Sequence, residues 1–447
     1  MAAIPLLTLV DLLVRPSWAV WSIATACAVF VTMQARHVAL AVRRTSAVLA
    51  LVTATLLPML PAPWAALEQG VRIGGVIASI LVTVNLLSRA VSRLPRARTV
   101  MSSLFRVSPG SRYFSLSLAS QFFGGLLGLA GIAMMMETAA QQDDFDHRAK
   151  LSSFSAIARG YAALSLWSPM YSNMSIVLGL YAGARWSAVL PVAVAVSGVF
   201  IVLGTLLDRM ATRNAPIVCR HPLVTTRTLL LQGWPVLLGM LAFLALVMLA
   251  SQAFGLPIAA TILAGSPLAA WAVNAHLMGG HRPAWRRGAR QVLHDMASFR
   301  MMSGEVMMFV TSGCAGTVVA AAIPASWITA VSALNGGSTV LACLVLSAAI
   351  VLLSVTAIHP MLSAVIVGSS LGPTQLGLPL LVHLSAVLVG WGLAIIVTPY
   401  SVLSTMANRW SGIPILVISV RANAVFVLLA LGVSASLLGV LARLIGP

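Results

Sequence analysis

The sequence predicts an all-α polytopic membrane protein with about ten transmembrane helices and two further broken or re-entrant helical hairpins. Of its 447 residues, 60% are hydrophobic and 8% are charged, against roughly 25% charged in an ordinary soluble domain. The hydrophobic residues gather in stretches of about 20, the length needed to cross a bilayer. We therefore expect a single transmembrane domain over residues 1–447, with no extramembrane domain and no removable signal peptide.

Ten stretches, taken in chain order, each have the length and apolarity of one membrane span. They lie near residues 17–33, 46–66, 72–91, 112–136, 187–207, 227–250, 255–275, 304–323, 374–397 and 413–440. Two further stretches, near 152–182 and 338–371, have roughly 30 residues or more and contain a polar break with a proline. Stretches of this kind form either kinked spans or re-entrant hairpins.

The two polar breaks resemble each other. Ser168–Ser172 reads Ser-Pro-Met-Tyr-Ser and His359–Ser363 reads His-Pro-Met-Leu-Ser, at an offset of 360 − 169 = 191 residues. A Phe-Arg pair upstream of each break recurs at the similar offset of 299 − 105 = 194 residues. We predict an internal duplication, with repeat 1 over 46–210, repeat 2 over 227–400 and a C-terminal helix over 413–447. Paired broken helices of this kind form the binding sites of many transporters.

Charge distribution predicts the topology. Basic residues cluster in four loops, Arg36–Arg44, Arg89–Arg112, Arg209–Arg227 and His281–Arg300, and the positive-inside rule places all four in the cytoplasm. This arrangement favours a re-entrant hairpin with its tip at Ser168–Asn173 and parallel repeats. If the broken stretches cross fully, the repeats are inverted, and two basic loops then lie outside. The sequence leaves both arrangements open.

The nine acidic residues all lie at or beyond the ends of the predicted spans. We therefore do not expect a carboxylate proton relay in the membrane. The net charge of +18 is read as a topology signal and as an attraction to anionic lipid headgroups, not as nucleic-acid binding.

The breaks are expected to bind a solute. Proline removes an amide donor and opens the helix before it, and helix N-termini after the breaks attract anions. Arg159 either pairs with an anionic substrate or extends to the interface, and His359 either takes up a coupling proton or is a neutral structural histidine. The predicted substrate-binding residues are Ser168, Ser172, Asn173, Ser175, His359, Ser363, Thr398, Ser401 and Arg159.

The segment Leu164–Asn173, which reads Leu-Ser-Leu-Trp-Ser-Pro-Met-Tyr-Ser-Asn, resembles the first hairpin of the divalent anion:sodium symporters in the ion transporter superfamily. Ser172 and Asn173 match the first two residues of that family's Ser-Asn-Thr tip motif, while Met174 replaces the threonine. The second tip, Ser363-Ala364, lacks the asparagine. The resemblance implies an elevator-type carrier, often dimeric, that takes up carboxylate-bearing solutes with sodium ions or protons. The departures from the motif put sodium coupling and dicarboxylate substrates in doubt.

Other chemistries have little support. No glycine-rich loop precedes Lys150, which is the only lysine, so the chain has no Walker A motif. The four cysteines are scattered without metal or disulfide spacing. We expect no catalytic residues, metal site or cofactor.

The sequence thus predicts a secondary active transporter for a small, carboxylate-like anion, driven by a proton or sodium gradient, and not an enzyme. Arginine-rich and alanine-rich composition points to the inner membrane of a bacterium with a GC-rich genome. The alternative is a membrane-embedded envelope enzyme that acts on a lipid-linked glycan. Substrate identity, transport direction and oligomeric state are not encoded in recognisable motifs.

Overall fold

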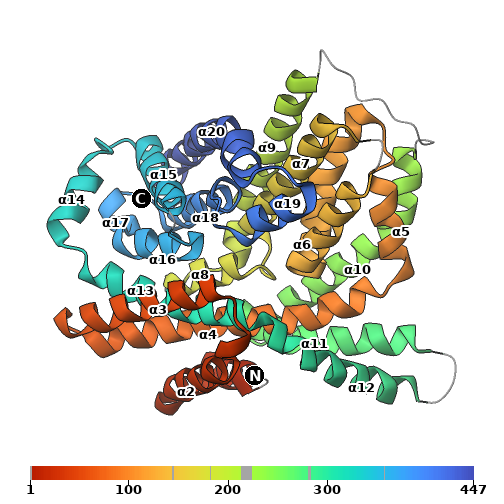
Figure 1. Cartoon of the computed structure of the whole chain (residues 1–447). Helices are drawn as coiled ribbons and strands as arrows, with labels where there is room; N and C mark the ends of the chain where they lie inside the picture. Colours follow the sequence, from red (N-terminus) through yellow and green to blue (C-terminus); the bar gives the residue numbers. More distant parts are fainter. Residues whose placement is uncertain are drawn as a thin grey trace.

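Helices make up all the regular secondary structure of the described residues, which are 3–142, 145–181, 183–212, 224–279, 283–356 and 358–446 of the computed structural model. Nine of these helices are long and apolar enough to cross a membrane. The predicted all-α polytopic membrane fold is therefore confirmed (Figure 1).

The helices fall into two groups by their mutual packing. The first group contains α1 (Ala3–Val14), α2 (Ser17–Gln34), α3 (Leu40–Leu56), α4 (Pro63–Ser92), α5 (Pro95–Leu104), α10 (Thr226–Ala253), α11 (Ile258–Leu277), α12 (Ala284–Met296) and α13 (Ser303–Ala322). The second group contains α6 (Pro109–Ala140), α7 (His147–Trp167), α8 (Ser172–Leu180), α9 (Trp186–Thr212), α14 (Ala325–Ala333), α15 (Thr339–Val355), α16 (Pro360–Ser370), α17 (Pro373–Leu376), α18 (Leu380–Val397), α19 (Val402–Ser411) and α20 (Ala422–Ile445).

Helices α4 and α13 form the long antiparallel pair at the centre of the first group (Figure 1). They approach closely because glycines line the contact. A Cβ atom on Gly70 would lie 2.6 Å from Cα of Cys314, and one on Gly74 would lie 2.8 Å from Cα of Val310. Small residues allow such backbone approach between membrane helices. This pair makes the most extensive contacts between the groups, through α4 with α6 and α8 and through α13 with α16, and α5 and α10 also contact α6.

The stretch predicted as a span at 112–136 is a helical hairpin. Within α6, Gly128 has non-helical backbone angles (φ 56°, ψ −144°). A Cβ atom on Gly131 would lie only 2.6 Å from the carbonyl oxygen of Phe123, whereas eight residues of straight helix would separate them by about 12 Å. The chain therefore reverses at Gly128, where the positive φ requires glycine.

The broken stretch near 152–182 is not folded back in this way. Helices α7 and α8 follow each other across the break, and α8 packs against α4, α16 and α18 (Figure 1). The reversal expected at Ser168–Asn173 thus lies about 40 residues earlier, at Gly128. The sequence did not reveal it because the stretch around Gly128 is uninterrupted by proline or polar residues. The stretch near 338–371, in contrast, does form a hairpin of α15 and α16, with its break at Thr356–His359.

Helix boundaries in the two halves of the chain recur at one spacing. Helices α4 and α13 end 322 − 92 = 230 residues apart, and the starts of α5 and α14, of α6 and α15, and of α8 and α19 have the same separation. Side-chain contacts follow the pattern. The Ser117 hydroxyl donates to the carbonyl of Ala156 across 39 residues, and the Ser347 hydroxyl donates to the carbonyl of Ala386 across 39 residues. With the offset of 230 residues, the counterpart of Ser168-Pro169 is Thr398-Pro399, which lies in the break between α18 and α19.

Candidate functional site

Helices α18 and α19 are separated by a break in which a chain of hydroxyl groups replaces helical hydrogen bonds. Ser401 caps α19, and its Oγ accepts the amide of Ser404 at 3.0 Å. The Ser404 hydroxyl donates to the carbonyl of Thr398 at 2.7 Å. Thr398 in turn donates from Oγ1 to the carbonyl of Ser354 at 2.8 Å. The break is thereby joined to the end of α15.

The hairpin of α15 and α16 completes this network. The Ser354 hydroxyl donates to Oγ of Ser363 at 3.1 Å, and both side chains are fully buried. His359 caps α16 by accepting the amide of Met361 on Nδ1 at 3.3 Å, and its ring packs edge-on against Phe309, with ring centroids 6.0 Å apart. We call the residues His359, Ser354, Ser363, Thr398, Ser401 and Ser404 the hydroxyl cluster. It brings together four predicted site residues from stretches that are distant in sequence.

The other predicted residues lie at the first break. Ser168 ends α7 and is buried, with its amide bonded to the carbonyl of Leu164 at 3.1 Å. Asn173 and Ser175 lie in α8 and are also buried. Within the described part of the chain, neither Nδ2 of Asn173 nor Oγ of Ser175 has a hydrogen-bond partner. The side chain of Ser172 lies outside the described residues. Buried polar atoms without partners are rare in folded proteins, so this end of α8 is suited to a polar ligand.

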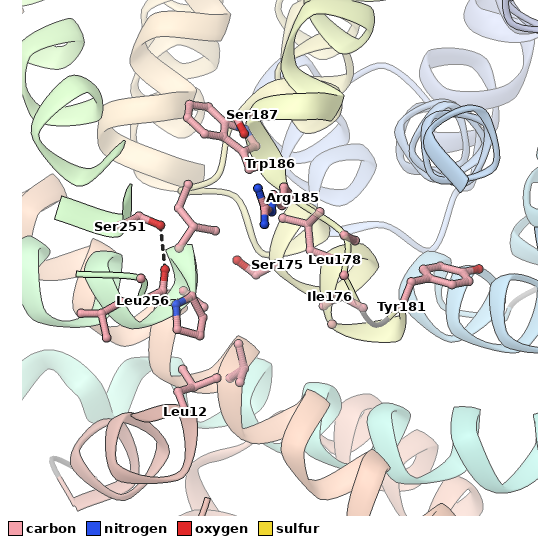
Figure 2. A pocket seen from close by; sticks show the side chains of 18 of the residues that line it. Leu12, Ser175, Ile176, Leu178, Tyr181, Arg185, Trp186, Ser187, Ser251 and Leu256 are labelled. Atoms are coloured by element: carbon pink, nitrogen blue, oxygen red, sulfur yellow. Dashed lines mark hydrogen bonds between the residues drawn. The ribbon is translucent and has the colours of Figure 1, made fainter. Parts of the chain in front are cut away.

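A cavity of about 950 Å³ opens beside α8, between the two helix groups. Its walls come from α1, α4, α8, the α8–α9 loop and the junction of α10 with α11. Figure 2 shows the Ser175 hydroxyl and the Arg185 guanidinium directed into the same space. Among the predicted site residues whose side chains are described, Ser175 lines this cavity; the others belong to the hydroxyl cluster or to the packed interior.

The cavity has a positive wall. Arg15, Arg72 and Arg185 line it together with one carboxylate, that of Asp11. Arg72 lies 3.4 Å from Asp11 Oδ1 and 2.9 Å from Glu68 Oε1. Among the described residues, neither Arg15 nor Arg185 has a carboxylate within ion-pair distance. These arginines are not part of any recognisable sequence motif, because Arg15 and Arg185 each stand alone beside a helix and Arg72 stands alone within α4.

Asp11 lies outside the nine candidate membrane spans of the described residues, yet it is buried. Residues 3–14 form α1, which packs against α4, and Asp11 in it is only 3% exposed. With 12 residues, α1 is too short to span a bilayer by itself.

Arg159 lies deep in the second helix group. Its guanidinium donates to Asn423 Oδ1 at 3.0 Å, to Tyr113 Oη at 3.0 Å and to the carbonyl of Ala422 at 2.7 Å. Its charge also lies over the ring of Phe426, 4.6 Å from the centroid. These contacts satisfy each nitrogen of the guanidinium, and the side chain neither lines the cavity nor extends to an interface.

The two halves meet at the end of α8. Tyr181 donates its hydroxyl to the carbonyl of Gly368 in α16, and its ring stacks edge-on against His383 of α18, with centroids 5.2 Å apart. His383 contacts the carbonyl of Leu371 through Nε2 at 2.6 Å. The first break is therefore linked to the hairpin that carries the hydroxyl cluster. No group of three or more potential metal-ligating side chains occurs within the described ranges.

Comparison with known proteins shows a structural similarity but no match in sequence. No protein-family model matches the sequence, and no curated protein matches it. The structure is similar to the crystal structure of the YdaH transporter of Alcanivorax borkumensis, which was described as having an unusual topology. The similarity covers 82% of this chain and 85% of the other, with 18% sequence identity and a TM-score of 0.53. The chain therefore shares the fold of that transporter. The specific resemblance to divalent anion:sodium symporters is not confirmed by this match.

Proposed function

We propose that the protein is a secondary active transporter that carries a small, carboxylate-like anion across the bacterial inner membrane. The observation that carries the proposal is the cavity beside α8, where three arginines and one carboxylate surround the unpartnered hydroxyl of Ser175. Its lining charge is 3 − 1 = +2 with Asp11 ionised. A positive wall in a low-dielectric cleft attracts and concentrates anions.

The position of the cavity fits a solute that enters from outside the cell. Arg15 precedes α2 and Arg185 precedes α9, while the basic loops follow the opposite ends of these helices. The junction of α10 and α11 likewise lies at the ends remote from the basic residues. With the four basic loops in the cytoplasm, the cavity opens on the extracytoplasmic side.

The hairpin at Gly128 supports this topology. Both ends of α6 lie on the same side, and the broken helix α7–α8 then crosses the membrane to reach the cavity. All four basic loops remain cytoplasmic, although the two halves run in opposite directions. The spacing of 230 residues supports an inverted repeat, in which α7–α8 and α18–α19 are equivalent broken helices.

Transport is proposed to proceed by movement of the second helix group against the first. The cavity lies between the groups, so sliding of α8 past α4 would carry a bound solute toward the opposite face. A gradient of protons or sodium ions would supply the energy. A homodimer held by the first group fits the same scheme, because that group must remain fixed in the membrane.

Uptake into proteoliposomes tests the proposal. The protein is reconstituted and supplied with labelled succinate, malonate, phosphate and sulfate, under an imposed pH or sodium gradient or under neither. We expect gradient-dependent accumulation of at least one anion, reduced at least about tenfold in Arg185→Gln. Uptake that merely equilibrates without a gradient would contradict secondary active transport. Turnover of a lipid-linked glycan in the same vesicles, without anion uptake, would favour the envelope enzyme.

A further inference from the structure

Asp11 is placed in the cavity wall without adequate hydrogen bonding. Its side chain is 4% exposed, and its Oδ1 atom, which faces Arg72 at 3.4 Å, accepts no hydrogen bond within the described part of the chain. The same Arg72 nitrogen is 2.9 Å from Oε1 of Glu68, which is 43% exposed and does not line the cavity. Arg72 is thus shared between a buried carboxylate inside the cavity and a solvated one beside it.

Few other charges surround Asp11. Its own helix contributes Arg15, and α4 contributes Arg72 and Glu68. The other helices packed against α1 are α2 and α11. They carry no carboxylate or arginine, and their titratable side chains are Cys27 in the middle of α2 and His276 in the last turn of α11. Among these neighbouring charges, Arg72 has the largest influence on the charge state of Asp11.

We propose that Asp11 is the ion-pair partner of Arg72 in the protein without bound solute. A small dianionic solute replaces Asp11 as the partner of Arg72 when Asp11 binds a proton. This inference rests on the proposed function and assigns its solute class. A solute with two negative charges matches the cavity. Neither Arg15 nor Arg185 has an ion-pair partner among the described residues, and Arg72 becomes the third arginine that can bind the solute.

Electrostatics couples the two events. A buried carboxylate that loses its arginine to a solute is left desolvated and unpaired, which is costly. A proton removes that charge, so solute binding favours protonation and protonation favours solute binding to the same degree. The solute then enters together with one proton at this site. The affinity for the dianion should rise as the pH falls, since the competing carboxylate disappears.

Calorimetric titration of the purified full-length protein with sulfate tests this scheme, because sulfate remains a dianion between pH 5.5 and pH 8. For the wild-type protein we expect affinity to rise about tenfold over that range as pH falls. Titrations in buffers of different ionisation enthalpy should report uptake of about one proton per sulfate. In Asp11→Asn the affinity should be independent of pH and as high as that of the wild type at pH 5.5, with no proton uptake.

Glu68→Gln is the matched control, because it removes the other carboxylate on Arg72 and leaves Asp11 in place. It should keep the pH dependence and the proton uptake. Sulfate binding to the wild type without proton uptake, or an unchanged pH dependence in Asp11→Asn, would overturn the inference and leave the proposed transport intact. If Asp11→Asn does not fold, proton uptake by the wild type alone decides. Failure of every anion to bind or to be transported would instead reject the proposed function.

Discussion

Arg159 in α7 and Asn423 at the start of α20 are joined by a hydrogen bond of 3.0 Å, although 264 residues separate them in sequence. Asn423 also donates from Nδ2 to the carbonyls of Ile396, Ile418 and Ser419. It thereby holds together the last turn of α18, the π-helical turn before α20 and the arginine. A π-helical turn is uncommon and needs such support.

We predict a structural role for this pair. Arg159→Gln should lower the free energy of unfolding, because Asn423 Oδ1 and Tyr113 Oη lose their charged partner. The coupling energy with Asn423→Ala, from a double-mutant cycle of unfolding in detergent, should be about 1–3 kcal/mol. Arg185→Gln is the control for loss of an arginine, and it should leave the stability of the ligand-free protein unchanged. Equal effects of Arg159→Gln and Arg185→Gln would argue against this role.

Close helix contacts give a second prediction. A Cβ atom on Gly390 would lie 2.8 Å from the carbonyl oxygen of Ser347, so α15 and α18 would have to separate in Gly390→Ala. We expect a loss of about 1–3 kcal/mol in unfolding free energy. Gly198→Ala in α9 is matched, because its Cβ would meet no atom within 4 Å. That variant should be neutral or up to about 1 kcal/mol more stable. Equal destabilisation of both variants would show that the close contact at Gly390 is not the cause.

The hydroxyl cluster supplies a third prediction. Thr398→Val keeps the shape of the side chain but removes the donor to the carbonyl of Ser354. It should cost about 1–3 kcal/mol of stability, the penalty for a buried acceptor without a partner, and should slow solute uptake. Thr25→Val removes a hydroxyl bonded to its own helix on an exposed face. A similar loss of unfolding free energy in Thr25→Val would mean that the hydrogen bond from Thr398 to α15 stabilises the fold no more than a hydrogen bond within one helix.

A fourth prediction concerns acid sensitivity in the first helix group. Arg93 donates to Asp295 Oδ2 at 2.7 Å and to Asn274 Oδ1 at 3.0 Å, joining α4 to α11 and α12. Burial raises the pKa of Asp295, but hydrogen bonds from Arg93 and Gln291 outweigh it, so the pKa is lowered from its usual value of 3.8. A lowered pKa stabilises the folded state above the unfolded pKa, and this contribution disappears as the pH falls through the folded value.

Asp295→Asn should therefore lower the unfolding temperature at pH 7 and have progressively less effect below about pH 4. Because Arg93 is about one third exposed, we expect a loss of only about 1–3 kcal/mol at pH 7. The measurement is thermal unfolding of both proteins across pH 3–8. A difference that stays constant over this range would exclude the ion pair as its cause.

Sequence reasoning located the membrane helices and several residues of the hydroxyl cluster, because apolar length and proline breaks are local signals. It did not find the reversal at Gly128, which depends on how α4 and α7 pack around a uniformly apolar segment. Nor did it predict that Arg72 and Arg185 line one cavity, since Arg72 lies in α4 and Arg185 in the α8–α9 loop, and only the fold brings these segments to the same cavity. The residues around His359 resemble those around Ser168, so the sequence predicted that these two breaks are equivalent. The spacing of the helix boundaries instead makes Ser168 equivalent to Thr398.

The hairpin at Gly128 has a consequence for how the chain is made. Its 32 residues are apolar enough to be integrated as one crossing helix when they leave the ribosome. Two contacts hold it reversed, namely the hydrogen bond from the Ser88 hydroxyl to the carbonyl of Leu127 at 2.6 Å and the packing of α7 against α6. A nascent chain that ends before α7 lacks the second of these. The membrane orientation of the helices beyond residue 140 is therefore set only after α7 has been synthesised and packs against the hairpin. It is not set when the hairpin itself enters the bilayer.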